Sequence, residues 1–65
     1  MELTATEKVL ARGLKAFGAT ENMVGAILML LDAQENLQDE LISYMVEHQN
    51  ATPRELLEHT IEMVR

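Results

Sequence analysis

The chain has 65 residues, a formal net charge of −6 and no cysteine. This length predicts one domain over residues 1–65, whose hydrophobic core supplies only about 3 to 5 kcal/mol of net stability, so we expect association with a partner to add to it. The lack of cysteine excludes disulfides and thiolate metal sites. With only one Tyr and one Phe but five Met, the composition favours helices over sheets. The sequence therefore predicts an all-α fold, a small bundle of three or four helices.

The charges are unevenly distributed along the chain. Neither Lys nor Arg occurs between residues 16 and 53, so the middle of the chain is purely acidic. Such a surface repels phosphate backbones and attracts basic proteins, which makes a basic protein a better candidate partner than nucleic acid. The longest apolar run, residues 23–31, is far shorter than the roughly 20 residues of a membrane span. Because the first residues also lack the features of a secretory signal, we expect a cytoplasmic protein that does not bind membranes.

The first helix is predicted over residues 5–17. Thr4 and Glu7 have the spacing of a capping box, in which two side chains satisfy free backbone amides at a helix start, and Gly18 is a suitable terminator. One side of this helix is apolar. The opposite side carries a basic face, which consists of Lys8, Arg12 and Lys15.

The second helix is predicted over residues 21–31, with Thr20 as its N-cap. Residues 23–31 are apolar in nearly every direction around the helix, so we expect neighbouring helices, from this chain or from a second copy, to cover it on all sides. Gly25 in this helix and Gly13 in the first each cost about 1 kcal/mol relative to alanine. Either they allow two helices to approach closely, or they are simply tolerated.

The third helix is predicted over residues 33–48, with Asp32 and Glu35 as a second capping box. An alternative is that the second and third helices are continuous, because neither Gly nor Pro separates them. The chain would then have the 4-3 apolar spacing of a coiled-coil seam with Gln34 as its polar position, and dimerisation would be nearly obligatory. We favour the break at Asp32, because the capping box has a specific mechanism.

The fourth helix is predicted over residues 53–65. Thr52 and Glu55 form the third capping box, and Pro53 occupies the first helical position, where its fixed φ is favourable. The apolar residues expected to be buried by this helix are Leu56, Leu57, Ile61 and Val64.

The apolar positions of the second and third helices predict an interface between two copies of the chain. We therefore expect a non-enzymatic interaction or regulatory module that forms a homodimer. The candidate interface residues are Met23, Ile27, Leu30, Leu31, Leu37, Leu41 and Tyr44.

The sequence offers no catalytic, cofactor or metal site. Ser43 lies within a predicted helix, without the turn and oxyanion donors that a nucleophile needs. Glu55, His59 and Glu62 share a helix face, but their spacing matches no metal motif, and Glu55 with His59 is better explained as an i, i+4 pair. We expect no enzymatic activity.

Two other functions remain open. The third and fourth helices, joined by a short connection, resemble a helix-turn-helix unit in which Arg54 lies near the start of the recognition helix, although Glu58 and Glu62 on that helix would face phosphates. If this unit binds DNA, the chain is a small DNA-associated regulator. Alternatively, it is an acidic inhibitor that occupies a basic nucleic-acid-binding groove on another protein.

Overall fold

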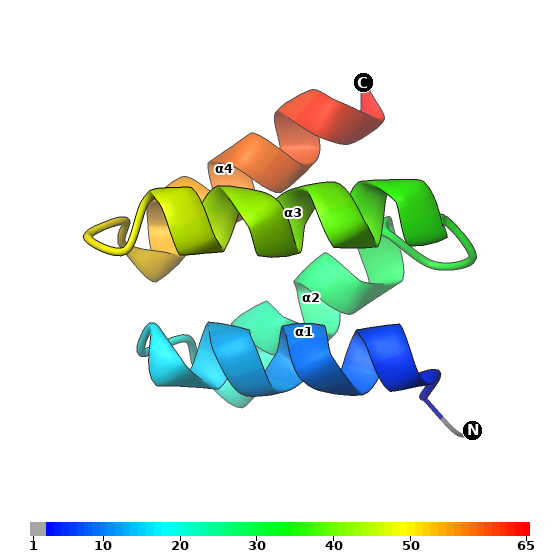
Figure 1. The fold of residues 1–65 in the computed structure, drawn as a ribbon, viewed down its shortest axis with the longest axis horizontal. Helices are drawn as coiled ribbons and strands as arrows, with labels where there is room; N and C mark the ends of the chain where they lie inside the picture. The colour runs from blue at the N-terminus through cyan, green and yellow to red at the C-terminus, as the bar shows by residue number, and fades with distance from the viewer. Residues whose placement is uncertain (1–2) are drawn as a thin grey trace.

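The computed structural model describes residues 3–65, and within them the chain forms four α-helices and no strand (Figure 1). The helices are α1 (Ala5–Ala16), α2 (Glu21–Leu30), α3 (Glu35–Glu47) and α4 (Pro53–Val64). The predicted all-α bundle is confirmed, and each predicted helix is present with ends that differ by at most two residues.

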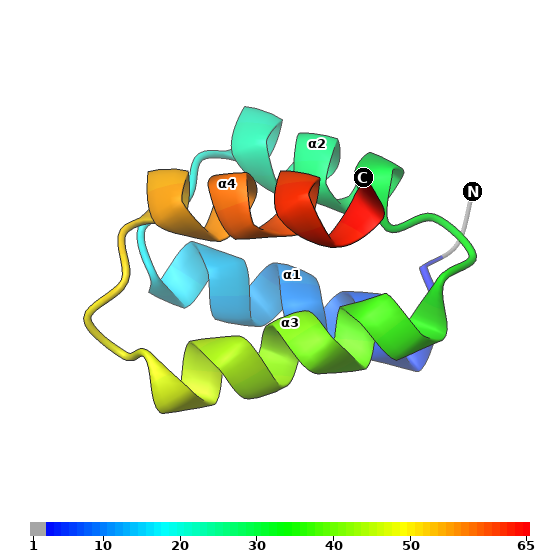
Figure 2. The same ribbon diagram turned by 90° about the horizontal axis from the view of Figure 1, so that it is seen from above.

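The helices form two layers that the chain visits alternately. α1 and α3 lie side by side and run in the same direction, while α2 and α4 form the second layer and run back across them (Figures 1 and 2). Each layer therefore consists of helices that are not consecutive in sequence. Contacts join α1 to α2 and α3, and α4 to α2 and α3.

A single core lies between the two layers and takes residues from all four helices. Its members are almost completely shielded from solvent, at 5% exposure or less. They are Leu10, Leu14, Val24, Ile27, Leu31, Leu41, Met45 and Leu56. Because no helix pair encloses this core alone, each layer depends on the other.

The helix starts show which capping predictions are right. In the first capping box, the Glu7 amide donates to Thr4 Oγ1 at 3.1 Å and the Thr4 amide donates to Glu7 Oε1 at 2.8 Å. Thr52 and Glu55 form the same reciprocal pair, at 3.2 and 3.1 Å. Thr20 Oγ1 accepts from the Met23 amide at 3.2 Å. Both boxes and the Thr20 cap are confirmed, as is the turn at Gly18, which has a φ of 96°.

The predicted break between the second and third helices is confirmed, but the predicted capping box at Asp32 is wrong. α3 is preceded by Gln34, which makes no side-chain cap. Asp32 still belongs to the turn that ends α2, since its amide donates to the Met29 carbonyl at 3.3 Å. The chain then reverses at Ala33, whose φ of 59° is left-handed. The continuous coiled-coil helix is therefore also wrong, because α2 and α3 lie in different layers (Figure 2).

Candidate functional site

The predicted interface residues fall into two groups. Ile27, Leu31 and Leu41 have no exposed surface and belong to the core of the single chain, so they are unavailable to a partner. The remaining four are partly exposed: Met23, Leu30, Leu37 and Tyr44. Of these, Leu37 and Tyr44 pack against the core. Of the predicted interface residues, only Met23 and Leu30, both on α2, are thus partly exposed and outside the core.

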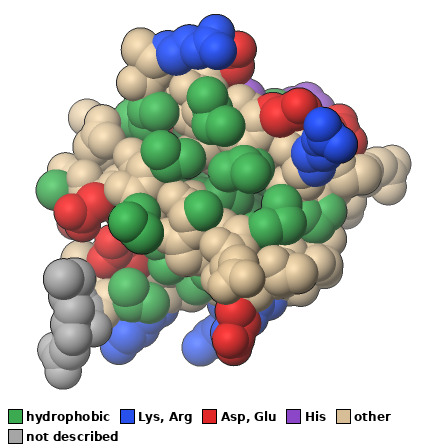
Figure 3. All heavy atoms as spheres, turned by 180° about the vertical axis from the view of Figure 1, so that it is seen from behind, with side chains coloured by type: hydrophobic (Ala, Val, Ile, Leu, Met, Phe, Trp, Pro, Cys, Tyr) green, Lys and Arg blue, Asp and Glu red, His purple; other side chains and the backbone are tan. Residues whose placement is uncertain are grey.

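The first candidate surface is the α2/α4 face, on the outer side of that layer. The apolar residues of these two helices that are at least partly exposed include Met23, Ala26, Met29 and Leu30 of α2 with Leu57 and Ile61 of α4. Met29 also lines a hollow with Leu3 and Glu7. Hydrophobic side chains gather over the middle of this side of the molecule, and charged groups lie towards its margins (Figure 3). Met29 is 80% exposed, and Ile61, which was expected to be buried, is 39% exposed. Patches of this kind on soluble proteins mark interaction sites.

The single chain covers residues 23–31 on one side only, so the cover expected on the other side from a second copy stays a prediction. The chain itself covers only the side of α2 that carries Val24 and Ile27, together with Leu31 after the helix. Met29 lies on the opposite side because it is about 140° further around the helix than Val24, at 100° per residue. The single chain leaves this side of α2 open.

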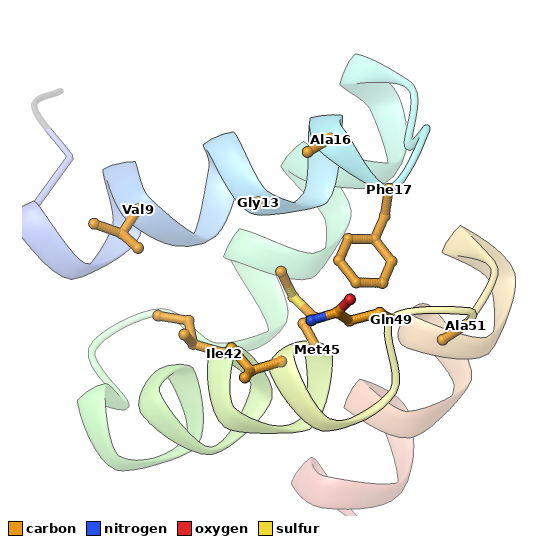
Figure 4. A pocket seen from close by; sticks show the side chains of 9 residues that line it. Val9, Gly13, Ala16, Phe17, Ile42, Met45, Gln49 and Ala51 are labelled. Atoms are coloured by element: carbon orange, nitrogen blue, oxygen red, sulfur yellow. The ribbon is translucent and has the colours of Figure 1, made fainter.

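The second candidate surface is the α1/α3 groove, which lies between the two parallel helices and has a volume of about 510 Å³. None of its lining residues is charged, and Gln49 is the largest polar group among them (Figure 4). Val9 is 57% exposed and Val46 65% exposed. The lining residues are Val9, Gly13, Ala16, Phe17, Ile42, Met45, Val46, Gln49 and Ala51.

Charges of opposite sign follow the two outer edges of the α1/α3 groove. Lys8, Arg12 and Lys15 each come directly before a groove residue in the sequence. They therefore lie beside the groove, on the outer side of α1, and all three are exposed. On α3 the exposed acidic residues at the corresponding outer positions are Asp39, Glu40 and Glu47. We name Asp39 and Glu47, which flank Ser43 at four-residue spacing, the acidic edge.

Neither edge forms an ion pair within residues 3–65. In the part that the structure describes, the ion pairs are Arg54 with Glu58 at 3.9 Å and Arg65 with Glu62 at 3.5 Å. Both lie on or directly after α4, with charged groups that are well exposed. Three of the five basic residues of the chain thus have no acidic partner within 4.0 Å among residues 3–65.

The two histidines of the chain pack against a tyrosine. The Tyr44 ring lies between two imidazoles, with centroid distances of 4.1 Å to His48 and 3.8 Å to His59. His48 Nδ1 is also 3.0 Å from the Tyr44 carbonyl oxygen. Across residues 3–65, no three His, Asp or Glu side chains are grouped so that they could hold a metal ion.

No helix within residues 3–65 has the length and apolar character needed to cross a bilayer. The chain matches no family model, and comparisons with curated proteins and with solved structures find no match either. The geometry of the two apolar surfaces is therefore the basis for any functional assignment.

The sequence placed Val46 on the apolar side of the third helix but did not indicate that it is exposed, and it did not single out Val9. A signal for them was present, since Val9, Gly13 and Ala16 follow one another at helical spacing directly beside the basic face, and Ile42 and Val46 do the same beside Ser43. What the sequence did not indicate is that these two stripes lie next to each other.

Proposed function

We propose that this protein is a non-enzymatic protein–protein interaction module that works as a homodimer. The observation that carries the proposal is the exposure of Val9, Met29 and Val46, each more than half accessible to solvent. Val9 and Val46 lie in the uncharged α1/α3 groove, and Met29 lies on the other layer, outside the core that the chain forms by itself. Contiguous apolar surface of this kind is costly in water and is typical of surfaces that a partner covers.

The composition of the surfaces supports a protein partner. Met29 and Met23 on the α2/α4 face have flexible, polarisable side chains that adapt to partners of different shape. The unpaired charges beside the α1/α3 groove can steer encounter with a protein of complementary charge.

The charges on α4 argue against DNA as the partner. In a helix-turn-helix unit α4 would be the recognition helix, yet Arg54 already pairs with Glu58 and Arg65 with Glu62. Both glutamates are exposed and would approach the phosphates of a duplex, which repel them. The acidic positions of α3 fit a basic protein better than a nucleic acid.

Sedimentation velocity over a dilution series from millimolar to micromolar protein tests the proposal. We expect the mass to fall from two chains to one on dilution. The double variant Met29→Glu/Val46→Glu, which places one charge on each apolar surface, should stay monomeric. Asn36→Glu/Asn50→Glu adds the same charge at exposed polar positions and should behave like the wild type.

A mobility-shift assay with mixed-sequence DNA at low salt tests the alternative, DNA binding. A chain that is monomeric at every concentration and binds DNA with a steep dependence on salt would replace the proposed function by DNA binding.

A further inference from the structure

We propose that the second copy docks on the α1/α3 groove, with α1 of one subunit lying over α3 of the other. This inference depends on the proposed homodimer and specifies its surface. Three features favour this arrangement: the register of the two helices, the charges on their edges and the sizes of the residues between them.

The register of α1 and α3 is fixed at both ends. Near the N-termini of the two helices, Thr4 and Glu7 line the same hollow as Glu35 and Gln38. Further along, a Cβ on Gly13 would touch the end of the Met45 side chain. A residue of α1 is thus level with the residue of α3 that is 31 or 32 positions later. Lys8 is level with Asp39, and Lys15 with Glu47.

This register makes the surface complementary to itself in one orientation. A homodimer interface joins the same patch on both subunits around a two-fold axis. If the axis runs along the groove, α1 of each subunit covers α3 of the other at the same level. Lys8 of one subunit then faces Asp39 of the other, and Lys15 faces Glu47. If the axis runs across the groove, α1 covers α1 and cations face cations, which is unfavourable.

With the two-fold axis along the groove, large residues between the charged edges of one subunit also face small residues of the other. Val46 is the most exposed large apolar residue of the groove, at 65%. With the axis along the groove it lies opposite Gly13 and Ala16 of the other subunit, where small side chains leave room for it. Small residues on one helix allow a bulky side chain of its neighbour to interdigitate at normal packing density.

Electrostatics also explain why the copy should choose this surface over the α2/α4 face. A chain with a net charge of −6 repels its own copy unless cations of one subunit face acids of the other. Among residues 3–65, the cations without an ion-pair partner are Lys8, Arg12 and Lys15 beside the groove, whereas the arginines on and directly after α4 already have acidic partners. The α2/α4 face lies in the opposite layer and remains open in such a dimer (Figure 2).

A charge-exchange experiment tests this arrangement. One variant carries Lys8→Glu/Lys15→Glu and the other Asp39→Lys/Glu47→Lys. Each variant alone places like charges along both edges of the interface, so we expect its dimer to dissociate at a concentration at least about tenfold higher than the wild type. In an equal mixture, the reversed α1 faces the reversed α3, while the other edge keeps its native pairing. We expect a one-to-one heterodimer by native mass spectrometry, with a dissociation constant within about threefold of the wild-type value.

Two controls separate the groove from general effects. Arg54→Glu/Arg65→Glu makes the same change in net charge as Lys8→Glu/Lys15→Glu, but on and directly after α4, and its dimer dissociation constant should stay within about threefold of the wild-type value. Val46→Glu should abolish the dimer, whereas Met29→Glu should preserve it. Circular dichroism checks that every variant keeps its helical content.

The outcomes distinguish failure of this inference from failure of the proposed function. If Met29→Glu dissociates the dimer while Val46→Glu does not, or if the two charge-reversed variants fail to form a heterodimer, the groove is not the contact surface although the homodimer stands. Equal weakening by the α4 control would also overturn the inference, because net charge alone would then explain the result. A wild-type chain that is always monomeric would contradict both proposals.

Discussion

Gly13 of α1 lies against the end of the Met45 side chain of α3, since a Cβ at position 13 would lie 2.6 Å from Cε of Met45. The neighbour that a Cβ at position 13 would meet is thus a side chain of α3 and not the backbone of a closely approaching helix. Gly25 differs, because a Cβ there would meet no atom within 4 Å. At that position the glycine is merely tolerated.

The two glycines predict different responses to alanine. Gly25→Ala should raise the free energy of unfolding by about 1 kcal/mol, because alanine is favoured within a helix and meets open space. Gly13→Ala should raise the free energy of unfolding by less than half as much, because the end of the Met45 side chain must move to make room for the new Cβ. Urea denaturation at one protein concentration measures both. Equal gains would show that Met45 yields without cost.

The helix caps predict a contrast between threonine and aspartate. Thr4→Ala and Thr52→Ala should each lower the free energy of unfolding by about 1 kcal/mol, because each removes an acceptor for a backbone amide. Asp32→Ala should change it by less than about 0.5 kcal/mol, because Asp32 is exposed and does not cap α3. Thermal and urea unfolding of the three variants compares them. A large loss for Asp32→Ala would restore the predicted capping box.

Gln38 predicts a stabilising substitution in the core. The side chain is 1% exposed, and its Nε2 donates to the Leu31 carbonyl at 2.8 Å, but Oε1 has no partner. The Leu31 carbonyl also accepts from the Gln34 amide at 3.0 Å, so it stays satisfied without Gln38. Gln38→Met should raise the free energy of unfolding by about 1 kcal/mol, because it removes an unpaired buried oxygen at similar volume. Gln38→Ala is the control for lost volume and should be destabilising by denaturant unfolding.

The stack of Tyr44 on His59 predicts a measurable coupling between α3 and α4. A double-mutant cycle with Tyr44→Leu and His59→Leu should give a coupling energy of about 0.5 to 1.5 kcal/mol, as expected for stacked rings. Tyr44→Phe keeps the ring and should retain most of that coupling with His59. Additive single variants would mean that the stack contributes nothing to the contact between the helices.

The helices and most of their ends were predictable from the sequence because local chemistry determines them. Thr4, Thr20 and Thr52 act on amides within three residues of themselves, and Gly18 supplies a conformation that other residues rarely adopt. Asp32 has the same local signal as Thr4. It fails because α2 ends in a turn that includes Asp32 and the chain reverses one residue later, at Ala33.

The candidate surfaces were only partly predictable, because they depend on which helices become neighbours. α2 is apolar nearly all round, so its sequence could not show that Ile27 faces the core and Met29 faces solvent. The valines of the α1/α3 groove are isolated apolar positions on two helices separated by α2 in the sequence. Only the alternation of layers brings Val9 and Val46 to one surface.

The single core between the layers also links the two surfaces thermodynamically. Leu10 and Leu14 support the groove from the same cluster in which Val24 and Ile27 support the outer layer. Neither surface can persist when that cluster comes apart, so any molecule that binds one of them selects the folded chain and thereby preserves the other. Occupancy on one side would thus protect the distant side from proteolysis, without any change of shape passing between them.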